Sequence, residues 1–221
     1  MKSKPPKLAI FDTYKTKSQQ LTGEAIRQRF IIITLATQSN PIEKTRISIS
    51  KSIANKSQTI WKNLYSGIFL DLDEVLIPLG LVEEEGRLPL KRGPKALQEK
   101  GIPYYKLTKS GLLVSLSLKE LKNQQNILER FFSNASSEEK EFQEIIQKLS
   151  KIAPKFTHSL FEKYIRSYCN GKLENLLPMN LENLKIVYDE GLQVQKEFLE
   201  AFSHLSKSDM EKTVNLLNRI C

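Results

Sequence analysis

Apolar residues recur every three or four positions along most of this 221-residue chain, a spacing that predicts a mostly helical protein. The first helix is expected from residue 23 onward. Its apolar side carries Ile26, Phe30 and Ile33, while Arg27 and Gln28 lie outside that side. The preceding residues 1–22 are rich in lysine and show little periodicity, so they are interpreted as a flexible basic arm.

Shorter helices are predicted next, each with a recognisable start signal. Asn40 precedes Pro41 and can cap a second helix, since proline suits the first turn. Ser57 can cap a third helix over residues 57–66, with Gly67 as its stop. Asp71 then opens a further short helix over residues 72–79.

A β-hairpin with a long tip is predicted after these helices. Residues 81–85 are typical of a strand, the segment 86–102 is rich in glycine and proline, and residues 102–107 form the returning strand. Because side chains alternate along a strand, one of Tyr104 and Tyr105 is expected in the core.

The rest of the chain is predicted to be helical throughout. Apolar spacing and break residues divide it into five amphipathic segments: 109–133, 137–152, 157–169, 181–204 and 208–220. The predicted fold class is therefore mostly α with a small β-hairpin, ending in a C-terminal helical bundle.

Charge is distributed unevenly along the chain, whose net charge is +9. Residues 1–66 contain 12 basic and 3 acidic side chains, whereas residues 119–221 contain 15 of each. Between them, six acids over residues 71–85 precede a basic stretch at 87–109. A local excess of cations is typical of proteins that bind polyanions, although a merely solubilising surface would look the same.

Composition excludes several classes of protein. A hydrophobic content of 40% argues against wholesale disorder, and the apolar runs are too short to span a bilayer. Cys169 and Cys221 are 52 positions apart, which suits neither a disulfide framework nor a metal site and favours a reducing compartment. The chain is therefore expected to be cytoplasmic.

Two segments carry a resemblance to a known family. The run Gly80-Leu81-Val82-Glu83-Glu84-Glu85-Gly86, followed by a basic loop and Tyr104-Tyr105-Lys106-Leu107-Thr108-Lys109-Ser110-Gly111, resembles the wing of MarR- and PadR-type winged-helix regulators. Residues 50–64 likewise resemble a helix-turn-helix unit whose second helix reads DNA.

The resemblance implies three regions: the arm at 1–22, a winged-helix DNA-binding domain at 23–118, and a helical bundle at 119–221 that serves dimerisation or effector binding. It also implies a transcriptional regulator, associated with the chromosome, that binds double-stranded DNA.

In the family the recognition helix runs directly into the wing, whereas here residues 68–79 intervene. Helix 57–66 is preferred to helix 72–79 as the recognition element because acids at 71, 73 and 74 would face phosphates. The predicted DNA-binding residues are Lys56, Ser57, Gln58, Thr59, Lys62, Asn63, Arg87, Lys91, Arg92 and Lys95.

One segment is similar to a motif found in enzymes. The run from Gly67 to Leu76 is similar to the first motif of haloacid-dehalogenase-type phosphatases, in which Asp71 would be the nucleophile and Asp73 the acid/base with magnesium. That chemistry needs a doubly wound parallel sheet, and no alternating strands follow, so a helix cap is the preferred explanation. His158 and His204 stand alone, and we expect no catalysis, cofactor or metal.

Two further possibilities concern partners. Winged-helix regulators commonly pair, so a homodimer through residues 119–221 is expected. Aromatic residues in that half leave room for a small-molecule effector, for which the sequence gives no specific support. The alternative function is a winged-helix protein-interaction adaptor that does not bind DNA.

Overall fold

The computed structural model describes residues 6–16, 20–57, 61–90, 100–133, 137–187 and 189–220. The chain is mostly helical with one small antiparallel sheet among these residues, which confirms the predicted composition of secondary structure. The elements are α1 (Gly23–Thr37), η1 (Pro41–Lys44), α2 (Arg46–Ser57), α3 (Trp61–Leu70), η2 (Asp71–Leu76), β1 (Val82–Leu88), β2 (Ile102–Leu107), α5 (Lys109–Leu116), α6 (Gln124–Phe132), α7 (Ser137–Ile152), α8 (Pro154–Cys169), α9 (Leu181–Ile186), α10 (Glu190–Ser203) and α11 (Lys207–Ile220).

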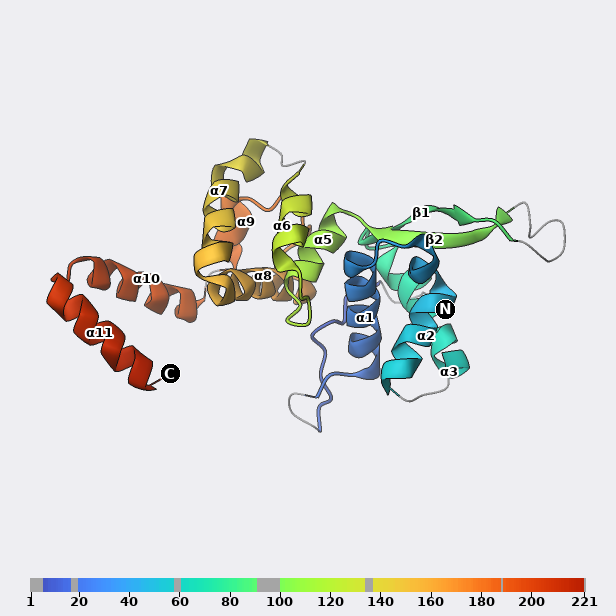
Figure 1. The fold of residues 1–221 in the computed structure, drawn as a ribbon, viewed down its shortest axis with the longest axis horizontal. Coiled ribbons are helices and arrows are strands. Elements are labelled where there is room, and N and C mark those ends of the chain that lie inside the picture. The colour runs from blue at the N-terminus through green and yellow to red at the C-terminus, as the bar shows by residue number, and fades with distance from the viewer. Residues whose placement is uncertain are drawn as a thin grey trace.

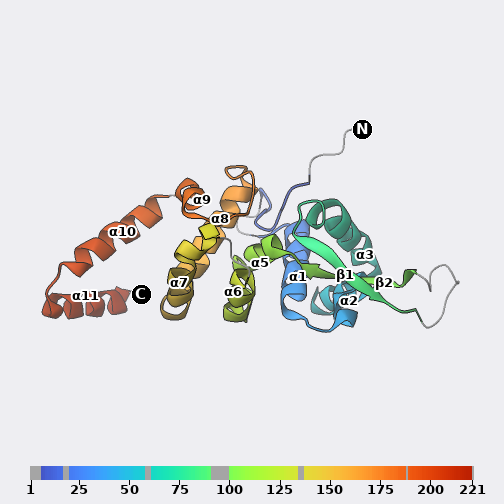
Figure 2. The same cartoon turned by 90° about the horizontal axis from the view of Figure 1, so that it is seen from above.

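The molecule is elongated. Helices α2 and α3 and the β1–β2 hairpin lie at one end, and α10 and α11 lie at the other (Figures 1 and 2). A continuous apolar core connects the two halves, because α5 packs against α1, α6 and α8. The core extends from Leu8 at the N-terminal segment to Phe161 and Ile165 on α8.

Helix α1 forms where it was predicted, and Phe30 and Ile33 pack against the core as expected, but the buried face is turned away from Ile26. Ile26 is half exposed, whereas Gln28 is fully buried together with Ile31 and Ile32. The reason is that Gln28 has internal partners: its Oε1 accepts the Ala9 N–H at 2.8 Å. A buried amide with satisfied hydrogen bonds is tolerated in a core, and helical periodicity of apolar residues alone does not reveal it.

The N-terminal segment is not a flexible arm over the residues described. Leu8, Ala9 and Ile10 are buried in the core, and Thr13 forms an isolated β-bridge with Leu21. Residues 1–5 and 17–19 of the predicted arm lie outside the described residues. In the sequence, the apolar run at 8–10 is short and lies among lysines, so it does not stand out as a buried segment.

The helices that follow depart from prediction at both ends. Asn40 does cap, accepting the Ile42 N–H at 3.0 Å, but it caps the short 3-10 turn η1, and α2 begins only at Arg46. The predicted cap at Ser57 is wrong, because Ser57 is the last residue of α2 and α3 begins at Trp61. Helix α3 also does not stop at Gly67: it continues to Leu70 and directly into the π-helical segment η2. The predicted separate helix at 72–79 is therefore wrong, since its residues extend α3.

The predicted hairpin is confirmed. Strand β1 pairs with β2 in antiparallel register from Val82 opposite Leu107 to Leu88 opposite Ile102, with an irregularity between Glu84 and Gly86. Tyr105 is buried, as expected for one of the two tyrosines. In addition, Thr45, between η1 and α2, forms an antiparallel bridge with Tyr104, so it extends the sheet by one residue.

The C-terminal half is helical as predicted, with more breaks than expected. The segment 109–133 divides into α5 and α6, and 181–204 divides into α9 and α10. At the second break, the Asp189 side chain accepts the Leu192 N–H at 2.9 Å and starts α10. Helix α8 begins at Pro154, three residues earlier than predicted, because proline occupies the first turn of a helix without loss of a hydrogen bond.

Candidate nucleic-acid interface

Two arginine–aspartate pairs hold α3 and η2 against the rest of the N-terminal half. Arg27 on α1 donates from Nε to Asp71 Oδ2 at 2.7 Å, and Arg46 on α2 pairs with Asp73. The side chain of Asp71 is only 4% exposed. Burial raises the pKa of Asp71, and the hydrogen bond and charge of Arg27 act against that increase. Both aspartates are therefore structural anchors of the helix.

These two pairs bear on the repulsion that the sequence predicted between this helix and DNA phosphates. Asp71 and Asp73 were expected to repel phosphates if this helix approached DNA. The structure turns both carboxylates toward arginines of neighbouring helices, so their charges are compensated within the fold. The same contacts occupy the two residues that resemble a phosphatase motif, and these residues lie in a helix, whereas that motif belongs at the end of a parallel strand.

Gly67 has a specific role in this arrangement. A Cβ atom at Gly67 would lie 2.8 Å from Nε of Arg27 and 3.0 Å from its Cζ. The missing side chain therefore provides the space through which the Arg27 guanidinium reaches Asp71, one turn further along the helix. A glycine that ends a helix and one that admits a neighbouring side chain look alike in a sequence.

The outward surface of α3 is mixed in character. Ser66, Phe69 and Leu70 are exposed, while Ile68 is buried. Helical periodicity puts positions 62 and 63 on the same side as Ser66. The side chains of Lys56, Ser57, Lys62 and Asn63, and all of Gln58 and Thr59, lie outside the described residues.

The acids of β1 are each paired with a cation, two from neighbouring segments and one from β1 itself. Glu83 pairs with Lys106 at 3.3 Å, Glu84 with Arg87 at 2.6 Å, and Glu85 with Lys44 at 2.8 Å. The acidic run that stood out in the sequence is thus neutralised at the base of the hairpin. The cationic character of the hairpin then depends on residues closer to its tip.

Arg87 is the one predicted DNA contact whose side chain the structure describes. Its Nε donates to Glu84, its Nη1 donates to the backbone carbonyl of Lys100 at 3.1 Å, and its side chain is 45% exposed. Glu84 raises the pKa of the Arg87 guanidinium through a hydrogen bond. Lys91, Arg92 and Lys95 lie outside the described residues.

Arg46 is a residue of this region that the sequence analysis missed. Its guanidinium lies 4.8 Å from the centre of the Phe69 ring and 5.3 Å from that of Tyr105, and it also pairs with Asp73. It therefore links α2, α3, η2 and β2 at one point, as a cation between two aromatic rings. No spacing rule connects these residues, because they come from three separate segments.

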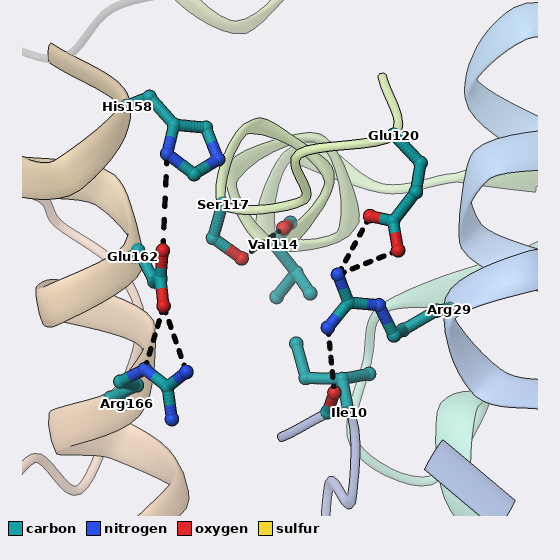
Figure 3. Close-up of polar contacts among 8 residues, drawn as sticks. All are labelled: Ile10, Arg29, Val114, Ser117, Glu120, His158, Glu162 and Arg166. Atoms are coloured by element: carbon teal, nitrogen blue, oxygen red, sulfur yellow. Dashed lines mark hydrogen bonds and ion pairs between the residues drawn. The ribbon is translucent and has the colours of Figure 1, made fainter. Parts of the chain in front are cut away.

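A polar junction connects the N-terminal half of the molecule, at α1, to the C-terminal helical half (Figure 3). Arg29 on α1 donates to both carboxylate oxygens of Glu120, at 2.6 and 2.8 Å, and to the carbonyl of Ile10 at 3.2 Å. Burial would raise the pKa of Glu120, but the hydrogen bond and charge of Arg29 keep it below its usual range. Across the α5–α6 connection, Glu162 on α8 lies between His158 and Arg166.

His158 also borders a surface depression of about 520 Å³. Burial and the charge of Lys119 lower the pKa of His158, whereas Glu162 acts in the opposite direction. None of its lining residues is a phenylalanine, tyrosine or tryptophan, so the depression does not match the effector site expected among the aromatic residues of this half. It is lined by Lys119, Gln124, Pro154, Lys155, His158, Ser159 and Glu162.

No protein-family model, curated protein or solved structure matches this chain. Among the residues described, no group of three or more histidine, cysteine, aspartate or glutamate side chains is placed to hold a metal ion. In the same part of the chain, none of the helices has the length and apolar character needed to cross a bilayer.

Proposed function

We propose that the chain is a DNA-binding protein of the winged-helix type that acts as a transcriptional regulator on the chromosome and has no catalytic activity. The observation that carries the proposal is the order and connection of its elements. Helix α3 with η2 leads through a turn over residues 77–81 into the β1–β2 hairpin, and Thr45 adds a bridge to β2 just before α2. A helix-turn-helix followed by a hairpin is the arrangement that places a helix in the major groove and a wing on the backbone.

Two corrections to the sequence-based interpretation support this proposal. The residues expected to interrupt helix and hairpin continue α3 as far as Leu76, so that only a turn over 77–81 separates this helix from the proposed wing. The acids at 71 and 73 are paired with Arg27 and Arg46, which reduces the repulsion of phosphates that argued against this helix and leaves Glu74 as its exposed acid. Under the proposal, residues 57–63 contact bases and phosphates, and residues 87–95 hold the DNA backbone.

A protein-interaction adaptor is the second candidate, and the described surface of α3 favours it. Phe69 and Leu70 are 42% and 48% exposed, more apolar than a surface that faces phosphates needs to be. Arg87 and Lys106 are already paired with acids of β1. Such a module would present α3 to another protein and would show no affinity for nucleic acid.

Fluorescence anisotropy with a random-sequence DNA duplex at two salt concentrations distinguishes these functions. DNA binding predicts an affinity that falls steeply with salt, because each phosphate contact releases counterions. Lys62→Ala should weaken binding to all sequences and reduce the salt slope by about one, while Gln58→Ala and Asn63→Ala should relax sequence preference. Lys148→Ala, on the exposed side of α7, is the matched control. An adaptor would give no saturable isotherm at either salt concentration.

A further inference from the structure

Helices α10 and α11 carry apolar side chains that the rest of the described chain leaves uncovered. None of the described residues in α10 or α11 is buried. Seven large apolar side chains on these helices and the turn between them are between 38% and 62% exposed: Val194, Phe198, Leu199, Leu205, Val214, Leu216 and Leu217. An exposed hydrophobic patch of this kind marks an interaction site in a folded protein.

Apart from Leu199 and Leu216, these apolar residues lie on one side of each helix. On α10 and just beyond it, Val194, Phe198, Phe202 and Leu205 recur at helical spacing, and the rings of Phe198 and Phe202 are 5.7 Å apart. On α11, Val214 and Leu217 follow Met210 at the same spacing. Polar and charged residues occupy the opposite sides, so both helices are amphipathic.

The two helices do not cover each other. They diverge as an open V at the end of the molecule that lies furthest from the hairpin (Figures 1 and 2). Among the described elements, neither makes more than marginal contact with any other. Each has 14 residues, a length at which an isolated helix is marginal in water, so their stability requires a packing partner.

We propose that this partner is a second copy of the chain, with α10 of each copy packed against α11 of the other. Charge favours the crossed arrangement. Helix α10 has three glutamates and Lys196 as its one basic residue, whereas α11 has three basic residues against Asp209 and Glu211. Pairing α10 with its own counterpart would place acidic helices side by side, and pairing it with α11 brings opposite charges together.

The available area is in the range that a dimer needs. Seven side chains of this size, about half exposed, offer roughly 600 Å² of apolar surface per copy, compared with about 800 Å² of total surface per partner in a stable interface. The polar edges of the four helices would supply the remainder. This proposal does not depend on DNA binding, although a dimer would present two hairpins to two half-sites.

Another covering of the same faces is possible within one chain. Helix α7 exposes Ile145 and Ile152, at 58% and 78%, and α11 could fold back onto them. A chain closed in this way would be a monomer, so the two arrangements differ in mass. They also differ in the apolar residues on which they depend, since only the closed monomer buries Ile145 and Ile152.

Sedimentation equilibrium of the full chain over a hundredfold range of concentration tests the proposal. The expected mass approaches twice the 25.4 kDa of the chain. Phe198→Glu combined with Val214→Glu should shift the dissociation constant upward by at least a hundredfold, and Ile152→Glu should leave it unchanged. A monomer at all concentrations, or a dimer that resists the double substitution, overturns the proposal.

Charge reversal provides a second test that does not depend on the apolar variants remaining folded. Glu197→Lys with Glu200→Lys should weaken the dimer at least tenfold, because α10 would then carry the sign of α11. Adding Lys212→Glu and Arg219→Glu to the same chain should restore the affinity. Loss of affinity without restoration contradicts the crossed pairing, since only opposed helices can compensate each other.

Discussion

Arg27 and Asp71 are joined by a 2.7 Å hydrogen bond that crosses from α1 to the π-helical continuation of α3. The bond passes over Gly67, which leaves room for the guanidinium. Since α3 continues into the hairpin, this contact fixes the position of both elements of the proposed interface relative to α1.

Gly67→Ala is expected to destabilise the protein, opposite to the usual effect. In a helix, alanine is ordinarily favoured over glycine by about 1 kcal/mol. Here the new Cβ would lie 2.8 Å from Nε of Arg27 and force the guanidinium away from Asp71. In the Arg27→Ala background the obstruction is gone, so the same substitution should become stabilising. Urea unfolding of the four proteins in this cycle measures the reversal, and an equal effect in both backgrounds would show that Gly67 does not serve Arg27.

Asp71→Ala should cost about 3 kcal/mol of folding free energy, because it leaves Arg27 without the partner of a largely buried pair. Asp71→Asn should cost less, since an amide oxygen can still accept from Arg27 and the uncharged group avoids the cost of burial. That cost is what raises the pKa of Asp71. Chemical denaturation at neutral pH compares the two variants.

The control for this comparison is Glu83→Gln. Its pair with Lys106 is about half exposed, so its loss should cost less than about 1 kcal/mol. If Asp71→Ala is no more harmful than Glu83→Gln, the Arg27 pair does not anchor α3.

Glu84→Gln is expected to increase affinity for DNA. The carboxylate of Glu84 holds the Arg87 guanidinium at 2.6 Å, and its neutralisation would release Arg87 toward phosphate. The salt slope of binding should become steeper by about one. Arg87→Ala should then lower affinity more in the Glu84→Gln background than in the natural chain. Anisotropy titrations that find the two backgrounds equal would remove Arg87 from the interface.

The junction at His158 is expected to weaken in mild acid. Burial lowers the pKa of His158 below 6.5 in the folded chain, so the unfolded chain binds the proton more tightly. The contribution of this residue to stability is therefore present above pH 6.5 and is lost as the pH falls through the folded value. Lys119, Glu120 and Glu162 face this histidine, and the lowered pKa of Glu120 confines its own titration to more acid conditions.

His158→Gln should reduce the loss of stability between pH 7.5 and pH 5.5, as measured by urea midpoints at both values. His204→Gln, at the exposed C-terminal end of α10, serves as the control and should behave as the natural chain does. An unchanged pH dependence in His158→Gln would mean that another group carries the acid sensitivity.

Local signals in the sequence predicted the parts of this fold that depend on local chemistry. The hairpin from Val82 to Leu107 follows from strand alternation and a glycine- and proline-rich turn, and the C-terminal helices follow from apolar spacing. The boundaries that failed depend on contacts between distant residues. Gly67 lies inside a helix, where it leaves space for Arg27, and the inward side of α1 includes Gln28, which bonds to Ala9, in place of Ile26.

The candidate site was less predictable than the fold. The acidic run at 83–85 stands out in the sequence, but the pairing of Glu83 with Lys106 depends on strand register and that of Glu85 with Lys44 on a segment 41 residues away. Arg46 carried no signal at all, because its aromatic and acidic neighbours come together only in the folded chain.

Hydrogen–deuterium exchange of the full chain with and without a DNA duplex tests the central claim most directly. The account predicts that DNA slows amide exchange in α3 and in the β1–β2 hairpin, while α10 and α11 exchange at the same rate in both samples. Slower exchange confined to α10 and α11, or no change anywhere at saturating duplex, would contradict it.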